Sequence, residues 1–457
     1  MTDQTSAPTT VEEVYAELLG RAPENKMEPR LAPLFRAMDV LGEPNKAFPI
    51  VHITGTNGKT STARMIEAGL RAYGLRTGRY TSPHLSRVTE RISIDGEPVA
   101  DTTFVRIWNE IAPYLGIVDA ELVAAGQPRL TYFECVTILG FAIFADEPVD
   151  VAVIEVGLGG VTDATNVGDG VVSVVTPISL DHTDLLGETT ADIAREKAGI
   201  IKPGGFLVSA AQPMDAAQVL LEKAREVGVE FRFEGVEFGV ESRTLAVGGQ
   251  LVTVQGLAGR YEDLTVPLHG AHQAENAAVA VAALEAFFGG GERELDAEIL
   301  REAFAGVTSP GRLEVVRTSP TIIVDAAHNP GGIRVTAEAL TEAFDFTRLV
   351  VVLGVLREKD AEEILRTLDE AFADVQVEFC FTQSASPRAI PADELAELAL
   401  DLGFAEEAVH TEEKLDDAIA YAVERADDVG DFGGGVLITG SITVVGEARI
   451  LLGTGAL

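Results

Sequence analysis

A glycine-rich segment, Ile-Thr-Gly-Thr-Asn-Gly-Lys-Thr-Ser-Thr at residues 53–62, carries the clearest chemical signal in the chain. It follows an apolar run and opens a helical pattern, so its backbone N–H groups and the positive end of the helix face one point. Glycines let these N–H groups converge on phosphate oxygens, and Lys59 is long enough to reach β and γ phosphates. The segment predicts a nucleoside triphosphate site. The competing interpretation, a tight strand-to-helix turn, leaves Lys-Thr-Ser at a helix start unexplained.

Two further side chains with metal-binding chemistry follow predicted strands. Glu155 ends the apolar run 149–156, and His182 comes a few residues after the run 171–178. Side chains at the carboxyl ends of parallel strands face the ligand crevice, so we expect two adjacent strand ends to bring this pair to the phosphate loop. Phosphate chemistry requires Mg²⁺, held by oxygen ligands. Alone, such a Glu is often a structural acceptor and such a His a core residue, but beside a phosphate loop the pair predicts a metal site.

Three other motifs are weaker. Residues 157–160, Gly-Leu-Gly-Gly, lack the third glycine and the following helical pattern of a dinucleotide fingerprint, which disfavours a nicotinamide site. His269 and His272 have HxxH spacing without a further zinc ligand, which favours a role at a helix start. Residues 325–331, Asp-Ala-Ala-His-Asn-Pro-Gly, end an apolar run and open a helix. They form either part of a second crevice or only a capped turn.

The elements that must position these residues are short strands alternating with longer helices. Apolar runs rich in Val and Ile, joined through amphipathic stretches, are typical of a mostly parallel sheet covered on both faces. The predicted fold class is therefore α/β. The first series has predicted strands at 49–54, 149–156 and 171–178 and helices at 60–72, 189–199 and 214–227.

A second series of elements follows the turn-rich residues 306–312. We predict that residues 1–307 form the domain with the phosphate loop and that residues 308–457 form a smaller Rossmann-like α/β domain. Residues 229–268 alternate polar and apolar side chains with many glycines, which predicts a small antiparallel patch at the end of the first domain. The second series has predicted strands at 321–327, 348–355, 375–381 and 434–440 and helices at 331–344, 360–373, 391–402 and 411–426.

Charge and composition limit the partners. The 457 residues include 35 Lys and Arg against 72 Asp and Glu, a formal net charge of −37, which repels nucleic acids and anionic membranes. The first ten residues lack the charged and apolar regions of a signal peptide, and no apolar run reaches the ~18 to 20 residues of a membrane span. Only two cysteines, Cys135 and Cys380, occur, far apart. We expect a cytoplasmic monomer that binds small molecules.

Ten short motifs, taken together and in order, resemble the folylpolyglutamate synthase family. This family includes the bifunctional dihydrofolate synthases of bacteria and belongs to the Mur ligase superfamily. The resemblance runs from about residue 15 to the C-terminus. The motifs are GTNGKTS (55–61), TSPHL with ERI (81–92), TYFE (131–134), VIEVGLGG with DATN (153–166), SLDHTDLLG (179–187), IAREKAGIIK (193–202), HQAENAAVA (272–280), PGRLEV (310–315), DAAHNPGG (325–332) and ITGSITVVGEAR (438–449).

The resemblance implies an ATP-dependent amide ligase with an N-terminal ATP-binding domain and a C-terminal glutamate-ligase domain. It also implies one or two Mg²⁺ ions. The γ-phosphate of ATP would pass to the carboxylate of a dihydropteroate or a folate, and the amine of L-glutamate would displace phosphate from the acyl phosphate. A carboxylate is a poor electrophile at neutral pH, so phosphorylation supplies the leaving group, and catalysis becomes positioning and charge neutralisation.

The resemblance also implies roles for individual residues. Lys197 would carry a carbamate, which turns a cation into an anion and supplies a carboxylate that the gene does not encode; the alternative is a lysine on a helix surface. Asp325 would bind ATP, and His328 would lie near the acyl phosphate and the incoming glutamate. The other implied ATP contacts are Asn57, Gly58, Lys59, Thr60, Asn276 and Arg312, and the implied metal ligands are Ser82, Glu155 and His182. The implied pteroate and glutamate contacts are Thr131, Tyr132, Phe133, Glu134, Thr162, Asp163, Ala164, Arg21 and Ser441.

Two alternatives to this activity stand beside it. A Mur ligase that acts on a UDP-linked cell-wall precursor carries a UDP-binding domain before its phosphate loop, and only about 50 residues precede Gly55. A binding or regulatory module with the same fold but no turnover has no need of the metal and carbamate residues together with Asp325 and His328. Both features favour the ligase.

Overall fold

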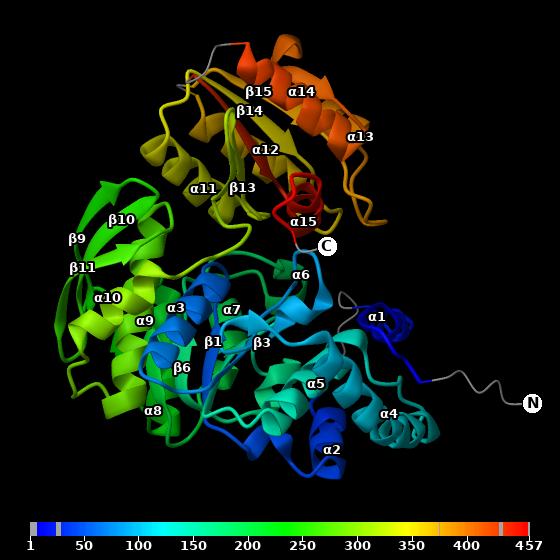
Figure 1. The fold of residues 1–457 in the computed structure, drawn as a ribbon, viewed down its shortest axis with the longest axis vertical. Helices are drawn as coiled ribbons and strands as arrows, with labels where there is room; N and C mark the ends of the chain where they lie inside the picture. The colour runs from blue at the N-terminus through cyan, green and yellow to red at the C-terminus, as the bar shows by residue number, and fades with distance from the viewer. Residues whose placement is uncertain (1–6, 24–28, 374, 429–432, 456–457) are drawn as a thin grey trace, which may run out of the picture.

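The structure of the chain is a computed structural model, and it describes residues 7–23, 29–373, 375–428 and 433–455. Figure 1 shows two lobes, an N-terminal lobe in blue to green and a C-terminal lobe in yellow to red. The N-terminal lobe ends with α10 (Ala297–Ala305), and the C-terminal lobe begins with β12 (Glu314–Thr318). The predicted boundary at residues 307 and 308 falls in the connection between them. Among the described residues, no helix is both long and apolar enough to cross a membrane.

The N-terminal lobe is built around an eight-stranded sheet with the order β4-β3-β2-β5-β1-β6-β7-β8. Neighbouring strands from β2 to β8 are parallel, and β3 and β4 add an antiparallel edge. The predicted α/β class is confirmed. The strands are β1 (Ile50–Thr54), β2 (Thr77–Tyr80), β3 (Ile92–Ile94), β4 (Glu97–Pro98), β5 (Val151–Glu155), β6 (Gly170–Val175), β7 (Phe206–Ser209) and β8 (Glu230–Phe233).

The central strands are rich in apolar residues because helices cover both faces of this sheet. In β1, Val51 and Ile53 share a core with α3 (Lys59–Ala72) and α9 (Ala271–Gly289), whereas Ile50 belongs to the core on the other face. Helices on that other face are α1 (Val11–Leu19), α2 (Ala32–Val40), α4 (Asp101–Ala124), α5 (Tyr132–Asp146), α7 (Thr190–Lys197) and α8 (Met214–Val227). A short helix, α6 (Thr183–Leu186), precedes α7.

The antiparallel patch predicted for residues 229–268 is present but shorter. Its three strands are β9 (Gly239–Ala246), β10 (Gly249–Gln255) and β11 (Arg260–Val266). Residues 230–233 form β8 instead, which pairs in parallel with β7. The prediction was wrong for β8 because alternating polar and apolar side chains describe an edge strand of either sheet equally well.

The C-terminal lobe has a six-stranded sheet with the order β12-β13-β17-β14-β15-β16, in which β12 is antiparallel to β13. Helices α11 to α13 cover one face, and α14 and α15 cover the other. The helix predicted for 411–426 begins at residue 415, because residues 409–411 pair with β15. The remaining elements are β13 (Thr321–Val324), α11 (Pro330–Ala343), β14 (Arg348–Leu353), α12 (Ala361–Ala371), β15 (Val377–Phe381), α13 (Ala392–Asp401), β16 (Val409–Thr411), α14 (Leu415–Asp427), β17 (Gly434–Thr439) and α15 (Ile442–Leu451).

Candidate active site

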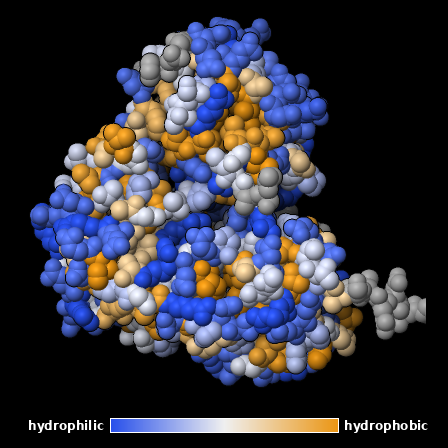
Figure 2. Space-filling view, in the orientation of Figure 1, coloured by the Kyte–Doolittle hydropathy of each residue, from blue (hydrophilic) through white to orange (hydrophobic). Residues whose placement is uncertain are grey.

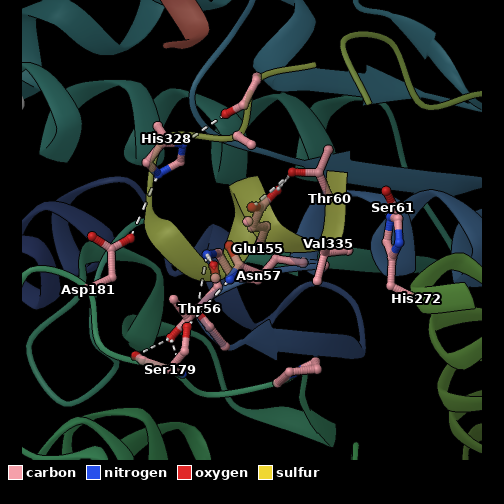
Figure 3. A pocket seen from close by; sticks show the side chains of 18 of the residues that line it. Thr56, Asn57, Thr60, Ser61, Glu155, Ser179, Asp181, His272, His328 and Val335 are labelled. Atoms are coloured by element: carbon pink, nitrogen blue, oxygen red, sulfur yellow. Dashed lines mark hydrogen bonds and ion pairs between the residues drawn. The ribbon is translucent and has the colours of Figure 1, made fainter. Parts of the chain in front are cut away.

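A cavity of about 510 Å³ lies between the two lobes. The segments that follow β1, β5 and β6 line it from one lobe, and the segment that follows β13 lines it from the other, as expected for the carboxyl ends of parallel strands. The surface is hollowed between the lobes (Figure 2), and Figure 3 shows the cavity from close by. The predicted site residues that line it are Asn57, Gly58, Lys59, Thr60, Ser82, Glu155, His182, Lys197, Asn276, Arg312, Asp325 and His328.

The glycine-rich loop joins β1 to α3 in a backbone conformation that favours glycine. Gly58 has a φ of 87°, and a Cβ there would lie 2.6 Å from Asn276 Oδ1 on α9. Lys59 begins α3, and its ammonium donates to the carbonyl oxygens of Gly55 and Thr56, each 3.1 Å away. Burial lowers the pKa of Lys59. An anion in the cavity would stabilise its charged form.

Glu155 ends β5 and lies against the first turn of α3. Its carboxylate accepts a hydrogen bond from Thr60 Oγ1 at 3.0 Å. Burial raises the pKa of Glu155, and the Lys59 charge acts against this shift. Ser82, which follows β2, also lines the cavity. Hydroxyl and carboxylate oxygens beside a phosphate loop suit a hard cation such as Mg²⁺.

His182 follows β6, on the other side of β1 from Glu155. The prediction that their strands are adjacent was wrong, because β1 pairs with both β5 and β6 and separates them. Burial and the charge of Lys359 lower the pKa of His182. Within the described parts of the chain, no three His, Cys, Asp or Glu side chains are grouped as a metal site. A cation here would therefore need hydroxyl and phosphate oxygens as well.

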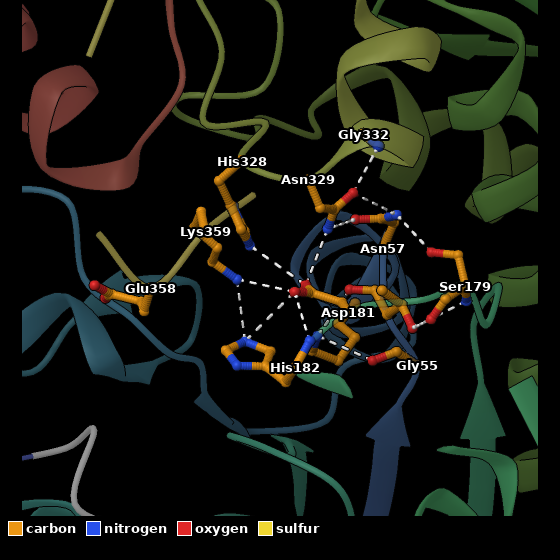
Figure 4. Close-up of polar contacts among 12 residues, drawn as sticks. Gly55, Asn57, Ser179, Asp181, His182, His328, Asn329, Gly332, Glu358 and Lys359 are labelled. Carbon is orange, nitrogen blue, oxygen red and sulfur yellow. Dashed lines mark hydrogen bonds and ion pairs between the residues drawn. The ribbon is translucent and has the colours of Figure 1, made fainter. Parts of the chain in front are cut away.

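A polar cluster around Asp181 joins the two lobes (Figure 4). One carboxylate oxygen accepts from Lys359 Nζ at 3.0 Å, and the other accepts from Asn329 Nδ2 at 3.0 Å. Asn329 also donates to Asn57 of the phosphate loop at 3.2 Å. Burial alone would raise the pKa of Asp181, but Lys359 and two nearby histidines outweigh it and hold the pKa below its usual value. Asp181, Asn329 and Lys359 were not predicted as site residues from the sequence, although Asp181 and Asn329 lie inside two of the motifs quoted above.

Lys197, the last residue of α7, is buried behind the phosphate loop. Its side chain donates to the Gly55 carbonyl at 2.8 Å, and the residue is 3% exposed. This burial excludes the alternative of a lysine on the helix surface. Burial, with the Lys59 charge as a second cause, lowers the pKa of Lys197 to about 7. A large fraction of the amine is therefore neutral near pH 7 and free to react with an electrophile.

Asp325 organises the chain where it passes from one lobe to the other. Its carboxylate accepts hydrogen bonds from the N–H groups of Leu313 at 2.8 Å and Ala327 at 2.9 Å, and from Thr336 Oγ1 at 2.8 Å. Arg312 precedes Leu313 and lines the cavity. The carboxylate thus fixes the connection to the start of α11.

His328 lies at the end of the cavity next to Asp181 (Figure 3). Its Nδ1 is 2.9 Å from the Ala326 carbonyl oxygen, which assigns the ring proton to Nδ1 and leaves Nε2 as an acceptor. Burial and the charge of Lys359 lower the pKa of His328 to about 4. The imidazole is therefore neutral at pH 7.

The predicted pteroate and glutamate residues are not among those that line the cavity. Thr131 caps the N-terminus of α5. Glu134 pairs with Arg30 at 3.1 Å, and Arg21 pairs with Asp119 at 2.9 Å. These three side chains tie the N-terminal helices together.

An aromatic group lies beside the segment that follows β2. Tyr132 meets the ring of Tyr15 edge-on, with 6.2 Å between centroids, and the Arg91 guanidinium lies 5.4 Å from the Tyr132 ring centre. Phe133 is buried in the same core. In the other lobe, Ser441 caps the N-terminus of α15.

Asp163 holds the loop between β5 and β6. It is fully buried and accepts hydrogen bonds from the N–H groups of Leu158 and Thr165, both at 2.9 Å. Thr165 Oγ1 in turn lies 2.9 Å from His52 Nε2 on β1. Of the neighbours of Asp163, Thr162 is half-buried and Ala164 is buried.

Two family models match the chain. The Mur ligase middle domain matches residues 102–284, and the Mur ligase glutamate ligase domain matches residues 311–442. The sheet with its phosphate loop lies in the N-terminal lobe, and the Asp325 segment lies in the second match. Fold and cavity together thus define a ligase of the Mur type.

Relatives of known identity narrow this class. The chain is 46% identical over 452 residues to a dihydrofolate synthase/folylpolyglutamate synthase of Mycobacterium tuberculosis, covering 95% of this chain and 92% of the relative. It is 37% identical to a folylpolyglutamate synthase of Lacticaseibacillus casei, covering 90% and 92%. The Mycobacterium tuberculosis folylpolyglutamate synthase complexed with ADP has a TM-score of 0.91 at 44% identity, covering 97% and 98%. The chain belongs to the dihydrofolate synthase/folylpolyglutamate synthase family and is a ligase.

Proposed function

We propose that the chain uses ATP to join L-glutamate to the carboxylate of dihydropteroate and of reduced folates. The names of its relatives, which combine dihydrofolate synthase with folylpolyglutamate synthase, support both acceptors. A solved complex of FPGS with AMPPCP and folate, with a TM-score of 0.83 at 31% identity, supports a site for a nucleotide and a folate together. The observation that carries the proposal is the single cavity that brings Lys59 and Glu155 of one lobe to Asp325 and His328 of the other.

The reaction has two steps. In the first, an oxygen of the acceptor carboxylate attacks the γ-phosphorus of ATP, and the bond from that phosphorus to the bridging oxygen breaks, which releases ADP and leaves an acyl phosphate. In the second, the glutamate amine attacks the acyl carbon, inorganic phosphate leaves and the nitrogen loses a proton. Lys59 neutralises the transferring phosphate, and the Nε2 acceptor of His328 takes up the proton.

The residues at the phosphate loop fit a magnesium ion. Glu155 supplies one carboxylate, Thr60 and Ser82 supply hydroxyl oxygens, and His182 supplies an imidazole. Mg²⁺ is commonly bound through one or two carboxylates with the rest of its shell from substrate phosphates and water. When bound, one or two such ions would neutralise phosphate charge. Glu155 then needs the anionic form that burial disfavours.

A carbamate on Lys197 would add a second negative group behind the loop. The lysine nitrogen attacks the carbon of CO₂, an N–C bond forms and a proton is released. The lowered pKa of Lys197 favours the neutral amine that this step requires. Carbamylation would also remove the positive charge that Lys197 carries when protonated. The repulsion between this charge and that of Lys59 would then disappear.

The acceptor site would lie beside the cavity, toward the aromatic group of Tyr132 and Phe133. Flat heterocycles stack well on aromatic rings. The loop of Thr162, Asp163 and Ala164 follows Gly157, which borders Phe133 and lines the cavity. Arg21, Thr131 and Glu134 would then act by holding this wall, and Ser441 by holding the start of α15.

We also propose that the protein acts as a monomer in the cytoplasm. Cys135 and Cys380 are both free and buried, which suits a reducing compartment. The strong net negative charge disfavours self-association. Light scattering after size exclusion should give the mass of one chain, 48.4 kDa, and a mass of twice this value would contradict the monomer.

ADP release tests the activity directly. Purified protein with Mg-ATP and L-glutamate is given dihydropteroate, a reduced folate monoglutamate, or no acceptor. We expect release with both acceptors and none without, and release with the folate alone would restrict the enzyme to extending folates. Lys59→Ala should lower turnover by at least about 100-fold, with an unchanged circular dichroism spectrum. Retained turnover in that variant, or silence of the wild type with both acceptors, would contradict the proposal and favour a non-catalytic module.

A further inference from the structure

The two lobes also meet through an apolar contact. Residues 82–87, which we call the Leu85 loop, follow β2 of the N-terminal lobe. The side chain of Leu85 packs against the core of the C-terminal lobe that lies beneath α14 and α15. Figure 1 shows α15 on the side of the C-terminal lobe that faces the N-terminal lobe. One leucine of the first lobe is thus shared with the core of the second.

The N-terminal lobe holds the Leu85 loop in one conformation. The Glu90 carboxylate accepts hydrogen bonds from three consecutive backbone N–H groups. These belong to Leu85 at 2.8 Å, Ser86 at 3.1 Å and Arg87 at 2.9 Å. Glu90 itself lies in the short helical turn directly before β3. Because one carboxylate fixes three N–H groups by charge-assisted hydrogen bonds, the loop is a rigid support for whatever packs on it.

Two glycines of the C-terminal lobe let this loop come close. On α15, a Cβ at Gly446 would overlap the carbonyl oxygen of Leu85. In the connection before β12, a Cβ at Gly311 would lie 3.1 Å from a methyl carbon of Leu85 and 3.2 Å from Val445 Cγ1. A glycine inside a helix is less favourable than an alanine, and the close approach of the Leu85 backbone explains the glycine at position 446.

The residues on both sides of Arg312 are tied to the C-terminal lobe. The carbonyl oxygen of Gly311 accepts from the Ala326 N–H group at 2.9 Å, and the N–H group of Leu313 donates to Asp325 at 2.8 Å. Arg312 therefore moves with the C-terminal lobe, although it is the neighbour of the residue that Leu85 touches. The position of Arg312 relative to the N-terminal lobe depends on that contact.

The Arg312 side chain faces the same part of the cavity as the phosphate loop. Both Arg312 and Lys59 line the cavity. Burial is the main cause of the lowered pKa of Lys59, and the charge of Arg312 adds to it. Two cations from different lobes thus lie close enough to repel each other, and an anion between them would be stabilised by both.

We propose that Leu85 is a positioning residue, on which the C-terminal lobe rests, and that its contact with Gly311 and Gly446 places Arg312 against the phosphates of the bound nucleotide. This rests on the proposed function, in that the phosphate loop binds a nucleoside triphosphate. Leu85 is not among the side chains that line the cavity, so it acts through Arg312 and not by touching the nucleotide.

Binding of Mg-AMPPCP without acceptor or turnover, measured by calorimetry, tests this role. Gly446→Ala puts a methyl group against a backbone oxygen that no change of rotamer can move, so binding must restore a displaced contact and the Kd should rise roughly 10-fold. Leu85→Ala should raise the Kd about 5-fold, and Leu85→Met, which nearly conserves the side-chain volume, should stay within about 2-fold of the wild type.

Two matched variants control for the substitutions themselves. Gly116 also lies inside a helix, α4, but a Cβ there would meet nothing within 4 Å. Leu400 on α13 of the C-terminal lobe is 40% exposed. Gly116→Ala and Leu400→Ala should both leave the Kd unchanged. Circular dichroism checks that each variant is folded, and Leu85→Ala carries the test if Gly446→Ala does not fold.

A double-mutant cycle separates positioning of Arg312 from general damage. Arg312→Ala alone should weaken binding, and in that background Gly446→Ala should change the Kd by less than about 2-fold, because the group that the contact positions is gone. An equal effect of Gly446→Ala with and without Arg312 would overturn the proposal. So would an unchanged Kd in Arg312→Ala, or unchanged values in both Gly446→Ala and Leu85→Ala.

Lys59→Ala tests the underlying nucleotide site separately. It should raise the Kd by the same factor in the wild type and in Gly446→Ala, because Lys59 belongs to the other lobe and does not depend on the Leu85 contact. If Lys59→Ala leaves the Kd of the wild type unchanged, the proposed nucleotide site itself is wrong, whatever the result for Gly446→Ala.

Discussion

At the scale of single residues, three ionisable side chains of the cavity are shifted toward their neutral forms. Burial lowers the pKa values of Lys59 and Lys197 and raises that of Glu155. A charge removed from water is costly unless an opposite charge or hydrogen bonds replace the water. The positive charges of Lys59 and Lys197 repel each other, and the Glu155 carboxylate compensates them only in part. A bound polyphosphate, and a carbamate on Lys197, would complete the compensation, so nucleotide binding should also stabilise the fold.

Carbamylation of Lys197 leads to a spectroscopic prediction. Protein equilibrated with ¹³C-bicarbonate at pH 8 should show a carbamate carbon signal by NMR, because the lowered pKa leaves the Lys197 amine neutral. The signal should vanish in Lys197→Ala, and turnover should fall by about 100-fold. Lys202→Ala is the control, since Lys202 is nearby, partly buried and outside the cavity. A signal that survives in Lys197→Ala, or no signal at all, would contradict the carbamate.

At the scale of elements, the loop between β5 and β6 depends on buried polar groups. Asp163 satisfies two backbone N–H groups of this loop, and Thr165 links it to His52 on β1. A buried N–H group that loses its acceptor destabilises the folded state by the full desolvation penalty of that group. The loop that borders the cavity is therefore anchored to the central strand of the sheet.

Removal of the Asp163 carboxylate should loosen this loop. Asp163→Ala should lower the free energy of unfolding by about 3 kcal/mol, because two buried N–H groups lose their acceptor. Urea denaturation measures the loss. Asp169→Ala is the control, since Asp169 is exposed on the same connection, and it should stay within about 0.5 kcal/mol of the wild type. A change for Asp163→Ala no larger than for Asp169→Ala would show that the loop does not depend on the carboxylate.

His52 should make the fold sensitive to acid. Burial lowers the pKa of His52 to about 3, below the value of about 6.5 expected in the unfolded chain. The unfolded state therefore binds the proton first, so the contribution of the neutral ring is full above about pH 6.5 and declines as the pH falls. Between pH 7.5 and 5, the wild type should lose about 2 kcal/mol more stability than His52→Asn. Parallel stability curves for the two proteins would show that folding does not lower the pKa of His52.

The central strands β1, β5 and β6 could be predicted from the sequence because almost all of their side chains are buried. In the run 149–156, six of the eight side chains are apolar, and Gly55 and Gly58 mark the phosphate loop. Strands β2, β3, β4, β7, β12 and β16 were not predicted, and β8 was assigned to the wrong sheet. All of them are only two to five residues long, and β8 and β16 are also edge strands with half-exposed side chains. The insertion of β1 between β5 and β6 could not be predicted, since strand order depends on the packing of distant segments and not on the pattern of any one run.

The candidate site divides in the same way. Residues inside quoted motifs, such as Lys59 and Glu155, line the cavity. The contact of Asp181 with Lys359 spans 178 residues, and neither residue type alone indicates the other. The residues of the TYFE motif were expected at the substrate, but the structure has Thr131 and Glu134 in caps and ion pairs. A motif identifies residues near a site. Only the fold shows which of them line the cavity and which position the surrounding helices and loops.

At the scale of the whole molecule, the two lobes meet through polar contacts around the cavity. Asp181 and Lys359 are only 12% and 10% exposed and lie next to the phosphate loop. A second pair joins Arg243 of the small sheet to Glu342 of α11 at 2.8 Å. Both pairs connect side chains from different lobes, so the relative position of the lobes depends on charge.

Loss of the Lys359 charge should therefore open the molecule. Lys359→Met leaves Asp181 without its main counter-charge, so the radius of gyration from X-ray scattering should increase. Turnover should fall roughly 100-fold, because side chains of both lobes line the cavity. Arg366→Ala is the control, since Arg366 pairs with Glu362 on the exposed side of α12 in the same lobe. An unchanged radius in Lys359→Met would show that this ion pair does not hold the lobes together.

The packing of α3 on α9 also has a consequence for synthesis of the protein. Met65, Ile66 and Leu70 of the helix that follows the phosphate loop share their core with α9, which lies about 200 residues later in the chain. At roughly 5 to 20 residues per second on the ribosome, these side chains wait about 10 to 40 s for their partner. The nascent N-terminal lobe thus keeps an apolar face uncovered until residue 289 has emerged, which makes it a natural client for chaperones during translation.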